Sequence, residues 1–74
     1  MFEKVKKILS SHVAVDSSLI TPEAALVADL GLSSFDVVNV VVEFEDEFNI
    51  EIADRDIRSL TTVNDILAYI KARV

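Results

Sequence analysis

Apolar residues recur with helical spacing through the first part of the chain. They stand at Phe2, Val5, Ile8, Leu9 and Val13, with lysines and serines on the other faces. This pattern predicts a helix from Phe2 to about Val13. The period is lost at Asp16-Ser17-Ser18, which is typical of a loop.

A longer helix is predicted from Ser33 to about Phe48. Ser33 can cap it, and Asp36 stands three residues later, where a capping box places its acid. Valine is frequent here and favours strands, but the cap, the period and the Glu-Phe-Glu-Asp-Glu continuation favour a helix. One stripe of this helix is expected to face the core: Val37, Val41, Phe44 and Phe48.

Three shorter segments complete the expectation. Thr21-Pro22-Glu23 is typical of a helix start, so a turn or two of helix ending at Gly31 is expected within the first connection. Asp54 to about Ser59 favours a short helix with Asp54 as its cap. Thr62 and Asp65 form another capping-box pattern before a last helix. The predicted fold is all-α, with three main helices, one short helix and a long first loop, in a single domain over residues 1–74.

Composition limits the function. A chain of 74 residues has room for one core but hardly for a walled substrate cleft, so a self-sufficient enzyme is not expected. There is no cysteine and only one histidine, His12, which excludes thiol catalysis and cysteine-ligated zinc and disfavours a histidine-based metal site. His12 is interpreted as a helix-end residue, which the helix dipole favours. The chain has no Gly-x-Ser-x-Gly elbow, so a Ser-His-Asp hydrolase is not expected.

The charge is concentrated in the middle of the chain. The net charge is −6, and residues 29–56 hold nine acids against one base. This balance argues against nucleic-acid binding. It suits either a solvated face or steering toward basic partners, and no calcium-loop motif is present. With no apolar run long enough for a membrane span or export signal, we expect a cytoplasmic protein without membrane attachment.

Ser34 would be the first residue of the middle helix. Val38 and Val42 share its face, offset from the core stripe, and are expected to be partly exposed beside Asp36, Glu43 and Asp46. A hydroxyl, a helix N-terminus, an apolar strip and an acidic rim form a plausible docking surface. On the residues alone, simple helix capping by Ser33 and Ser34 is the more common explanation.

Residues 29–36 change that balance. They read Asp-Leu-Gly-Leu-Ser-Ser-Phe-Asp, which resembles the acyl carrier protein signature Asp-Leu-Gly-x-Asp-Ser-Leu-Asp. The resemblance continues through residues 43–52, 60–63 and 69–70 and so spans nearly the whole chain. Four positions depart from the family pattern: Ser33 for Asp, Phe35 for Leu, Asn39 for an acid and Ala53 for Pro. Loss of the two acids weakens the expected partner contact, and Phe35 enlarges the apolar entrance.

The resemblance implies a non-catalytic carrier. Ser34 would hold 4′-phosphopantetheine, and the arm would carry acyl groups as thioesters for fatty acid, lipid or polyketide synthesis. Implied partners are a phosphopantetheinyl transferase and acyl-carrier synthetase, ketosynthase or acyltransferase enzymes with basic patches, and a monomer without bound metal is expected. The expected contact residues are Phe35, Asp36, Val38, Val42, Glu43, Asp46, Glu47 and Asp54. A peptidyl or aminoacyl carrier and an unmodified helical interaction module remain the alternatives.

Overall fold

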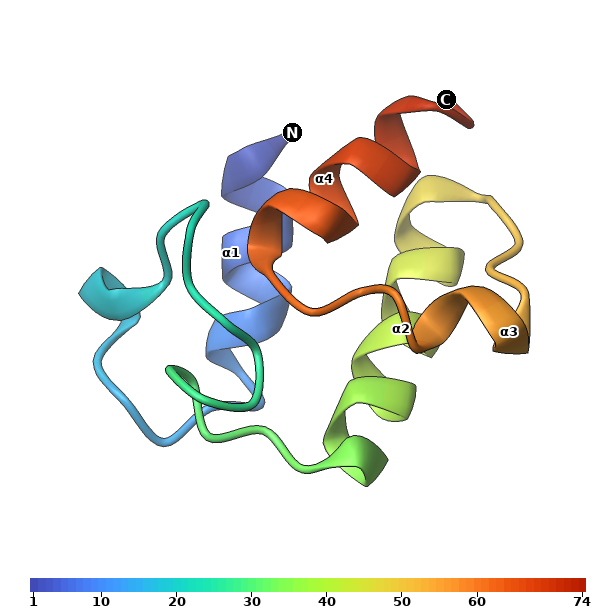
Figure 1. Cartoon of the computed structure of the whole chain (residues 1–74). Coiled ribbons are helices and arrows are strands. Elements are labelled where there is room, and N and C mark those ends of the chain that lie inside the picture. The colour runs from blue at the N-terminus through green and yellow to red at the C-terminus, as the bar shows by residue number, and fades with distance from the viewer.

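Four helices and one 3₁₀ turn form the structure, a computed structural model that describes all 74 residues (Figure 1). The elements are α1 (Phe2–Ser10), the 3₁₀ turn η1 (Ser17–Leu19), α2 (Ser34–Phe48), α3 (Asp54–Ile57) and α4 (Val63–Lys71). Figure 1 shows both termini at the same end of the molecule. The all-α prediction of three main helices, one short helix and a long first connection is confirmed.

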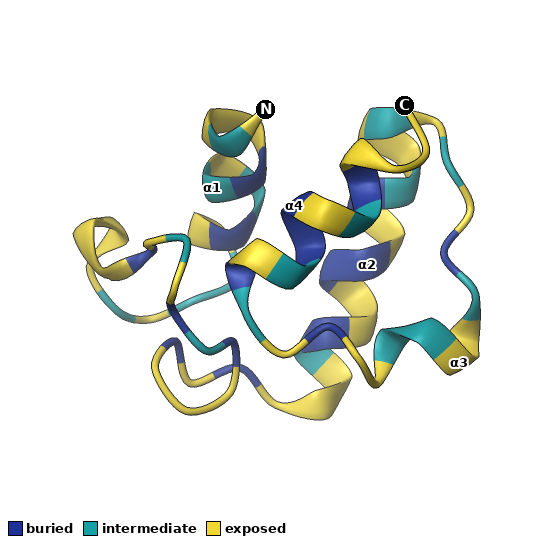
Figure 2. Ribbon diagram, turned by 45° about the horizontal axis from the view of Figure 1, so that its top comes forward, coloured by how far each residue is buried: buried dark blue, intermediate teal, exposed yellow.

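The core is built only from hydrophobic side chains, 17 in number (Figure 2). The helices contribute fully buried residues such as Leu9, Phe44 and Ile70, and the long connection adds Ile20, Leu26 and Leu30. The connection is therefore held by burial of its own leucines and isoleucine. Because the connection is anchored to the core in this way, it holds the start of α2 in a defined position.

α2 begins and ends as its sequence predicts. Ser33 Oγ accepts the Asp36 N–H at 3.1 Å, and Asp36 Oδ2 accepts the Ser33 N–H at 3.0 Å. Asn49 ends the helix in the left-handed conformation, with φ of 54°. Glu45 then accepts the Ile52 N–H at 2.9 Å, which ties the following link back to α2.

α4 has the second predicted capping box. The Asp65 N–H donates to Thr62 Oγ1, and Asp65 Oδ2 accepts the Thr62 N–H. The same carboxylate also accepts the Thr61 N–H and hydroxyl, the latter at 2.7 Å. These hydrogen bonds lower the pKa of Asp65, and they fix the segment that leads from α3 into α4.

The predicted helix from Thr21 to Gly31 does not form. The backbone of this segment pairs with the chain before α4: the Leu26 N–H donates to the Thr61 carbonyl, and the Val63 N–H to the Ala24 carbonyl. These hydrogen bonds between distant segments use backbone N–H and C=O groups that a helix would need for its own hydrogen bonds. The only helical piece in the connection is η1, which Asp16 caps through the Ser18 N–H. Gly31 has φ of +72°, a left-handed value that turns the chain toward α2.

Two helix bounds also differ from expectation. α1 ends at Ser10 rather than near Val13, because the Ser10 and Ser11 hydroxyls donate to the carbonyls of Lys7 and Ile8 and the chain passes into a turn. α3 ends at Ile57 rather than near Ser59.

Two side-chain expectations are wrong. Asp54 is not the cap of α3: the cap position is Ala53, whose carbonyl accepts the Asp56 N–H, and no side chain caps the helix. On α2, Phe48 is only half-buried, while Val40, outside the predicted stripe, is buried. Burial therefore covers the broad arc of Val37, Val40, Val41 and Phe44.

No helix of this chain has both the length and the apolar character needed to cross a membrane.

Candidate functional site

Ser34 lies at the exposed start of α2. It is the first residue of the helix, and Ser33 makes the cap, so the Ser34 hydroxyl is free of a capping role. The Asp29 carboxylate accepts the Ala25 N–H at 2.7 Å and closes the turn that precedes Gly31. The signature residues around Ser34 therefore shape the backbone that presents it.

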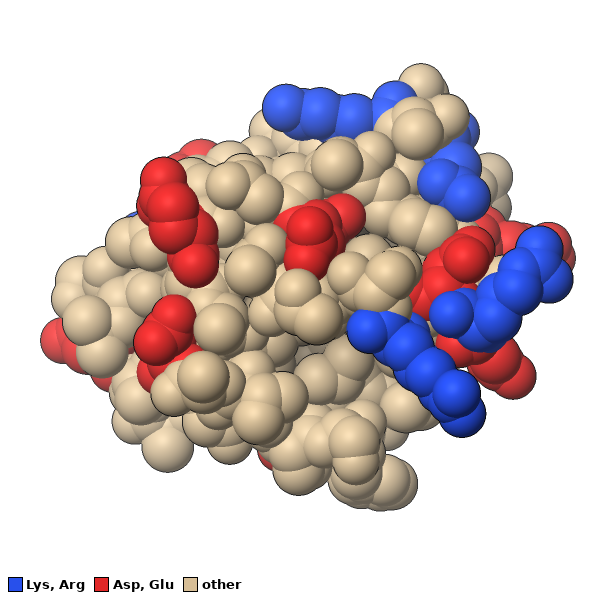
Figure 3. Space-filling model, in the orientation of Figure 1, with Lys and Arg blue, Asp and Glu red and all other residues tan.

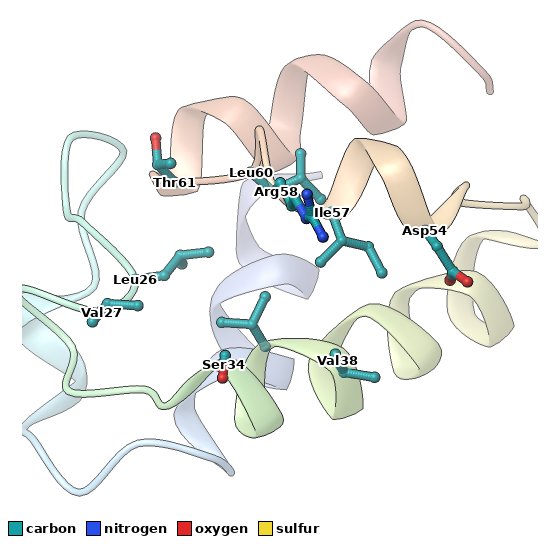
Figure 4. A pocket seen from close by; sticks show the side chains of 10 residues that line it. Leu26, Val27, Ser34, Val38, Asp54, Ile57, Arg58, Leu60 and Thr61 are labelled. Carbon is teal, nitrogen blue, oxygen red and sulfur yellow. The ribbon is translucent and has the colours of Figure 1, made fainter.

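An apolar pocket of about 620 Å³ opens beside Ser34 (Figure 4). Ser34 and Val38 of α2 form one wall, and Ile57, Arg58 and Leu60 lie opposite. Val37 of α2 also lines the pocket. Leu26, Val27 and Thr61 line the end near Ser34, whereas Asp54 lies at the other end. The pairing of Leu26 with Thr61 holds this end of the pocket in place.

Apolar side chains are also exposed around the pocket. Val38 is 45% exposed and Val42 is 50% exposed, which confirms that these two valines lie outside the core. Phe35, directly after Ser34, is the most exposed at 73%, and Val27 of the connection is exposed as well. Figure 3 shows largely uncharged surface over the start of α2, with basic and acidic side chains together over α3. The surface next to Ser34 is thus more apolar than the net charge suggests.

The predicted acidic contact residues are divided between two flanks of α2. Glu47 pairs with Lys4 of α1 at 3.5 Å, and Glu43 contacts His12 Nε2 in the turn after α1. Asp36 is held by Ser33, whose N–H and hydroxyl keep the pKa of its carboxyl below the usual value. Asp46 and Asp54 are exposed, and neither takes part in an ion pair. The structure brings Ser34, Val38 and Asp54 to one pocket, and places Glu43 and Glu47 beside α1.

Several pocket residues were not found from the sequence. Val27, Ile57, Arg58 and Thr61 belong to segments expected to be connections or a short helix, and only the folded chain brings them to Ser34. One signal was present: Arg58 is a base that comes two residues after the acidic segment 29–56.

The side chains offer no evident metal site: no three His, Cys, Asp or Glu residues are grouped so that they could hold an ion.

Comparison with known proteins gives three agreeing results. The family model for the phosphopantetheine attachment site matches residues 3–70. The acyl carrier protein of Thermotoga maritima is 43% identical over 74 residues, covering 100% of this chain and 91% of that protein. The solved structure of an acyl carrier protein from Enterococcus faecalis superposes with a TM-score of 0.83 at 34% identity, covering 99% of this chain and 92% of the other.

Proposed function

Because this chain belongs to the acyl carrier protein family, we propose that its Ser34 hydroxyl is the attachment point of the 4′-phosphopantetheine arm. Members of this family are non-catalytic carriers of acyl groups linked to phosphopantetheine. The observation that carries the assignment is the free hydroxyl at the first residue of α2, on the rim of an apolar pocket. Ser33, the neighbouring hydroxyl, is engaged in the capping box.

The residues around Ser34 suit the group that it would hold. A phosphodiester at the start of α2 lies at the positive end of the helix dipole, which stabilises its negative charge. The arm supplies a thiol for thioester formation, and this chain, which has no cysteine, has none of its own. The role of the chain is to present the hydroxyl and to shelter what the arm carries.

The pocket beside Ser34 is proposed to receive the acyl chain. Its lining is mostly aliphatic, from Leu26, Val37, Val38, Ile57 and Leu60. An acyl chain in this pocket leaves water, which stabilises it by roughly 25 cal/mol for each Å² of apolar surface buried.

The partners implied by the family are a phosphopantetheinyl transferase and the synthase enzymes that load and use the arm. We propose that ketosynthases, acyltransferases or synthetases with basic patches dock on Phe35, Val38 and Val42. The free acids Asp46 and Asp54 would guide them. Fatty acid synthesis is the pathway that the family implies. A monomer in the cytoplasm completes the proposal, and sedimentation of the purified protein tests the oligomeric state.

Mass spectrometry tests the attachment point. The protein is coexpressed with a broad-specificity phosphopantetheinyl transferase, and one arm is expected on each chain, placed on Ser34 by fragmentation. Ser34→Ala should remain unmodified while keeping its stability. The matched control is Ser33→Ala, which should be modified although loss of the cap destabilises it by about 1 kcal/mol.

An arm on Ser33 would overturn the assignment. So would a chain that carries no arm, which would indicate an unmodified interaction module. Loading by aminoacyl-activating enzymes in place of acyl-loading enzymes would instead indicate a peptidyl carrier.

A further inference from the structure

Arg58 brings a positive charge to the pocket that begins at Ser34. It follows α3 directly and lies between Ile57 and Leu60 in the wall opposite α2 (Figure 4). Apart from the Asp54 carboxylate, the other side chains that line this pocket are uncharged. Arg58 is thus the one cation that shares a pocket with the Ser34 hydroxyl.

The Arg58 guanidinium has no carboxylate partner. The ion pairs of the chain join Lys4 to Glu47 and Arg73 to Asp56, and the His12 ring contacts Glu43. Asp54, the only acid in the same pocket, lies at the end away from Ser34 and forms no ion pair with Arg58 (Figure 4). Arg58 is exposed, and its guanidinium, free of a carboxylate partner, is open to an anion at the mouth of the pocket.

Arg55, which lies on α3 itself, has different surroundings. It lines a separate, polar hollow together with Glu45, Glu51, Asp54 and Asp56, so its charge is opposed by nearby acids. The two arginines of this region therefore differ in what they face. Only Arg58 faces Ser34 across an apolar space.

We propose that Arg58 binds the phosphodiester of the prosthetic arm and so directs the start of the arm across the mouth of the pocket. This inference rests on Ser34 as the attachment point. A guanidinium can donate two parallel hydrogen bonds to phosphate oxygens. The Ser34 and Phe35 N–H groups, in the first turn of α2 and without acceptors inside the helix, add to the same attraction.

A carboxylate on the carried group is a second source of the same anionic chemistry. The phosphodiester is favoured because every loaded form of a phosphopantetheine carrier has it, whatever the acyl group, and because it is joined to the residue that shares the pocket with Arg58. A cargo carboxylate would be present only in some loaded forms.

NMR of the apo and holo protein tests the proposal, after intact mass and fragmentation have shown complete loading at Ser34. Loading should shift the Arg58 side-chain Nε–Hε resonance and leave that of Arg55 unchanged. Phosphorus relaxation should show an arm phosphate that is restrained in the native protein and freed by Arg58→Gln. Arg55→Gln, which removes a cation from the same region, is the matched control and should leave the arm restrained.

Each other outcome overturns the proposal. An unchanged Arg58 resonance and equal phosphate mobility in all three loaded proteins would reject Arg58 as the ligand while Ser34 stays the attachment point. A shift with malonyl cargo but not with butyryl cargo or the bare arm would show that Arg58 binds the cargo carboxylate instead. Absence of loading at Ser34 would overturn the proposed function as well.

Discussion

The two flanks of α2 are built in different ways. Toward α1, Val5 and Leu9 are fully buried against the core, and two side-chain contacts, Lys4 with Glu47 and His12 with Glu43, join the elements. Toward α3, the neighbour is a four-residue helix with no buried residue and no side-chain cap, and a pocket opens between. One helix thus has a packed flank and an open flank.

This difference separates stability from function within a small chain. The packed flank fixes the direction of α2 and therefore the position of Ser34. The open flank has few buried contacts, so its local opening costs less free energy than global unfolding. If Ser34 holds the arm, as we propose, the weak contacts lie on the side where a carried chain would be admitted and released.

The largest effect is expected from Phe44→Ala. Phe44 is fully buried, and such truncations cost about 3–5 kcal/mol, which is most of the stability of a chain this small. Val38→Ala, on the open flank, should cost less than about 1 kcal/mol because its side chain is 45% exposed. Urea midpoints of both variants measure the difference. If Val38→Ala unfolded as readily as Phe44→Ala, the division into flanks would be wrong.

The capping box at the start of α2 should weaken in acid. Hydrogen bonds from the Ser33 N–H and hydroxyl lower the pKa of Asp36. The stability that these bonds give the folded protein is therefore fully present above the ordinary pKa of an aspartate, and it is lost as the pH falls through the lowered pKa of Asp36. Asp36→Asn should lower the melting temperature by a constant amount near neutral pH. The difference from the native protein should shrink below about pH 4. Asp46→Asn, which removes neither a hydrogen bond nor an ion pair, is the control, and an equal pH dependence there would contradict the assignment.

Tyr69 holds α3 to α4 on the open flank. Its hydroxyl donates to Asp56 Oδ2 at 2.7 Å, which raises the Tyr69 pKa, and the Arg73 guanidinium lies 3.4 Å from the ring centroid. The stabilisation by this bond is present below the pKa of a free tyrosine and is lost as pH rises through the raised pKa. Since Tyr69 is the only tyrosine, phenolate absorbance follows it directly.

Tyr69→Phe should therefore speed hydrogen exchange in α3 and leave α1 and α2 protected. In Asp56→Asn the phenol should titrate at lower pH than in the native protein. An unchanged titration would show that the hydrogen bond contributes nothing in solution.

The smallest effect is expected on the packed flank. The Lys4 and Glu47 side chains are well exposed, and exposed pairs contribute about 0–1 kcal/mol. Lys4→Gln should therefore change the urea midpoint only slightly, and less in high salt. A loss approaching that of Phe44→Ala would show that charge, and not burial, holds α1 to α2.

Local sequence was sufficient wherever a side chain bonds to its own backbone neighbours. The capping boxes of Ser33 with Asp36 and Thr62 with Asp65 were predicted and are confirmed. Prediction failed where distant segments compete for the same backbone groups. Residues after Thr21 have the local pattern of a helix start, but their N–H and C=O groups pair with the chain before α4.

The sequence by itself determined the helices that are capped locally and the exposed face of Ser34, Val38 and Val42, because these depend on neighbours three or four residues apart. It also determined the family, because the resemblance extends over nearly the whole chain. Only the tertiary structure decided that Arg58, Ile57 and Leu26 meet Ser34 at one pocket. It also decided that Glu43 and Glu47 turn toward α1. Those contacts join segments far apart in the chain, and their geometry is set by how the whole core packs rather than by any local pattern.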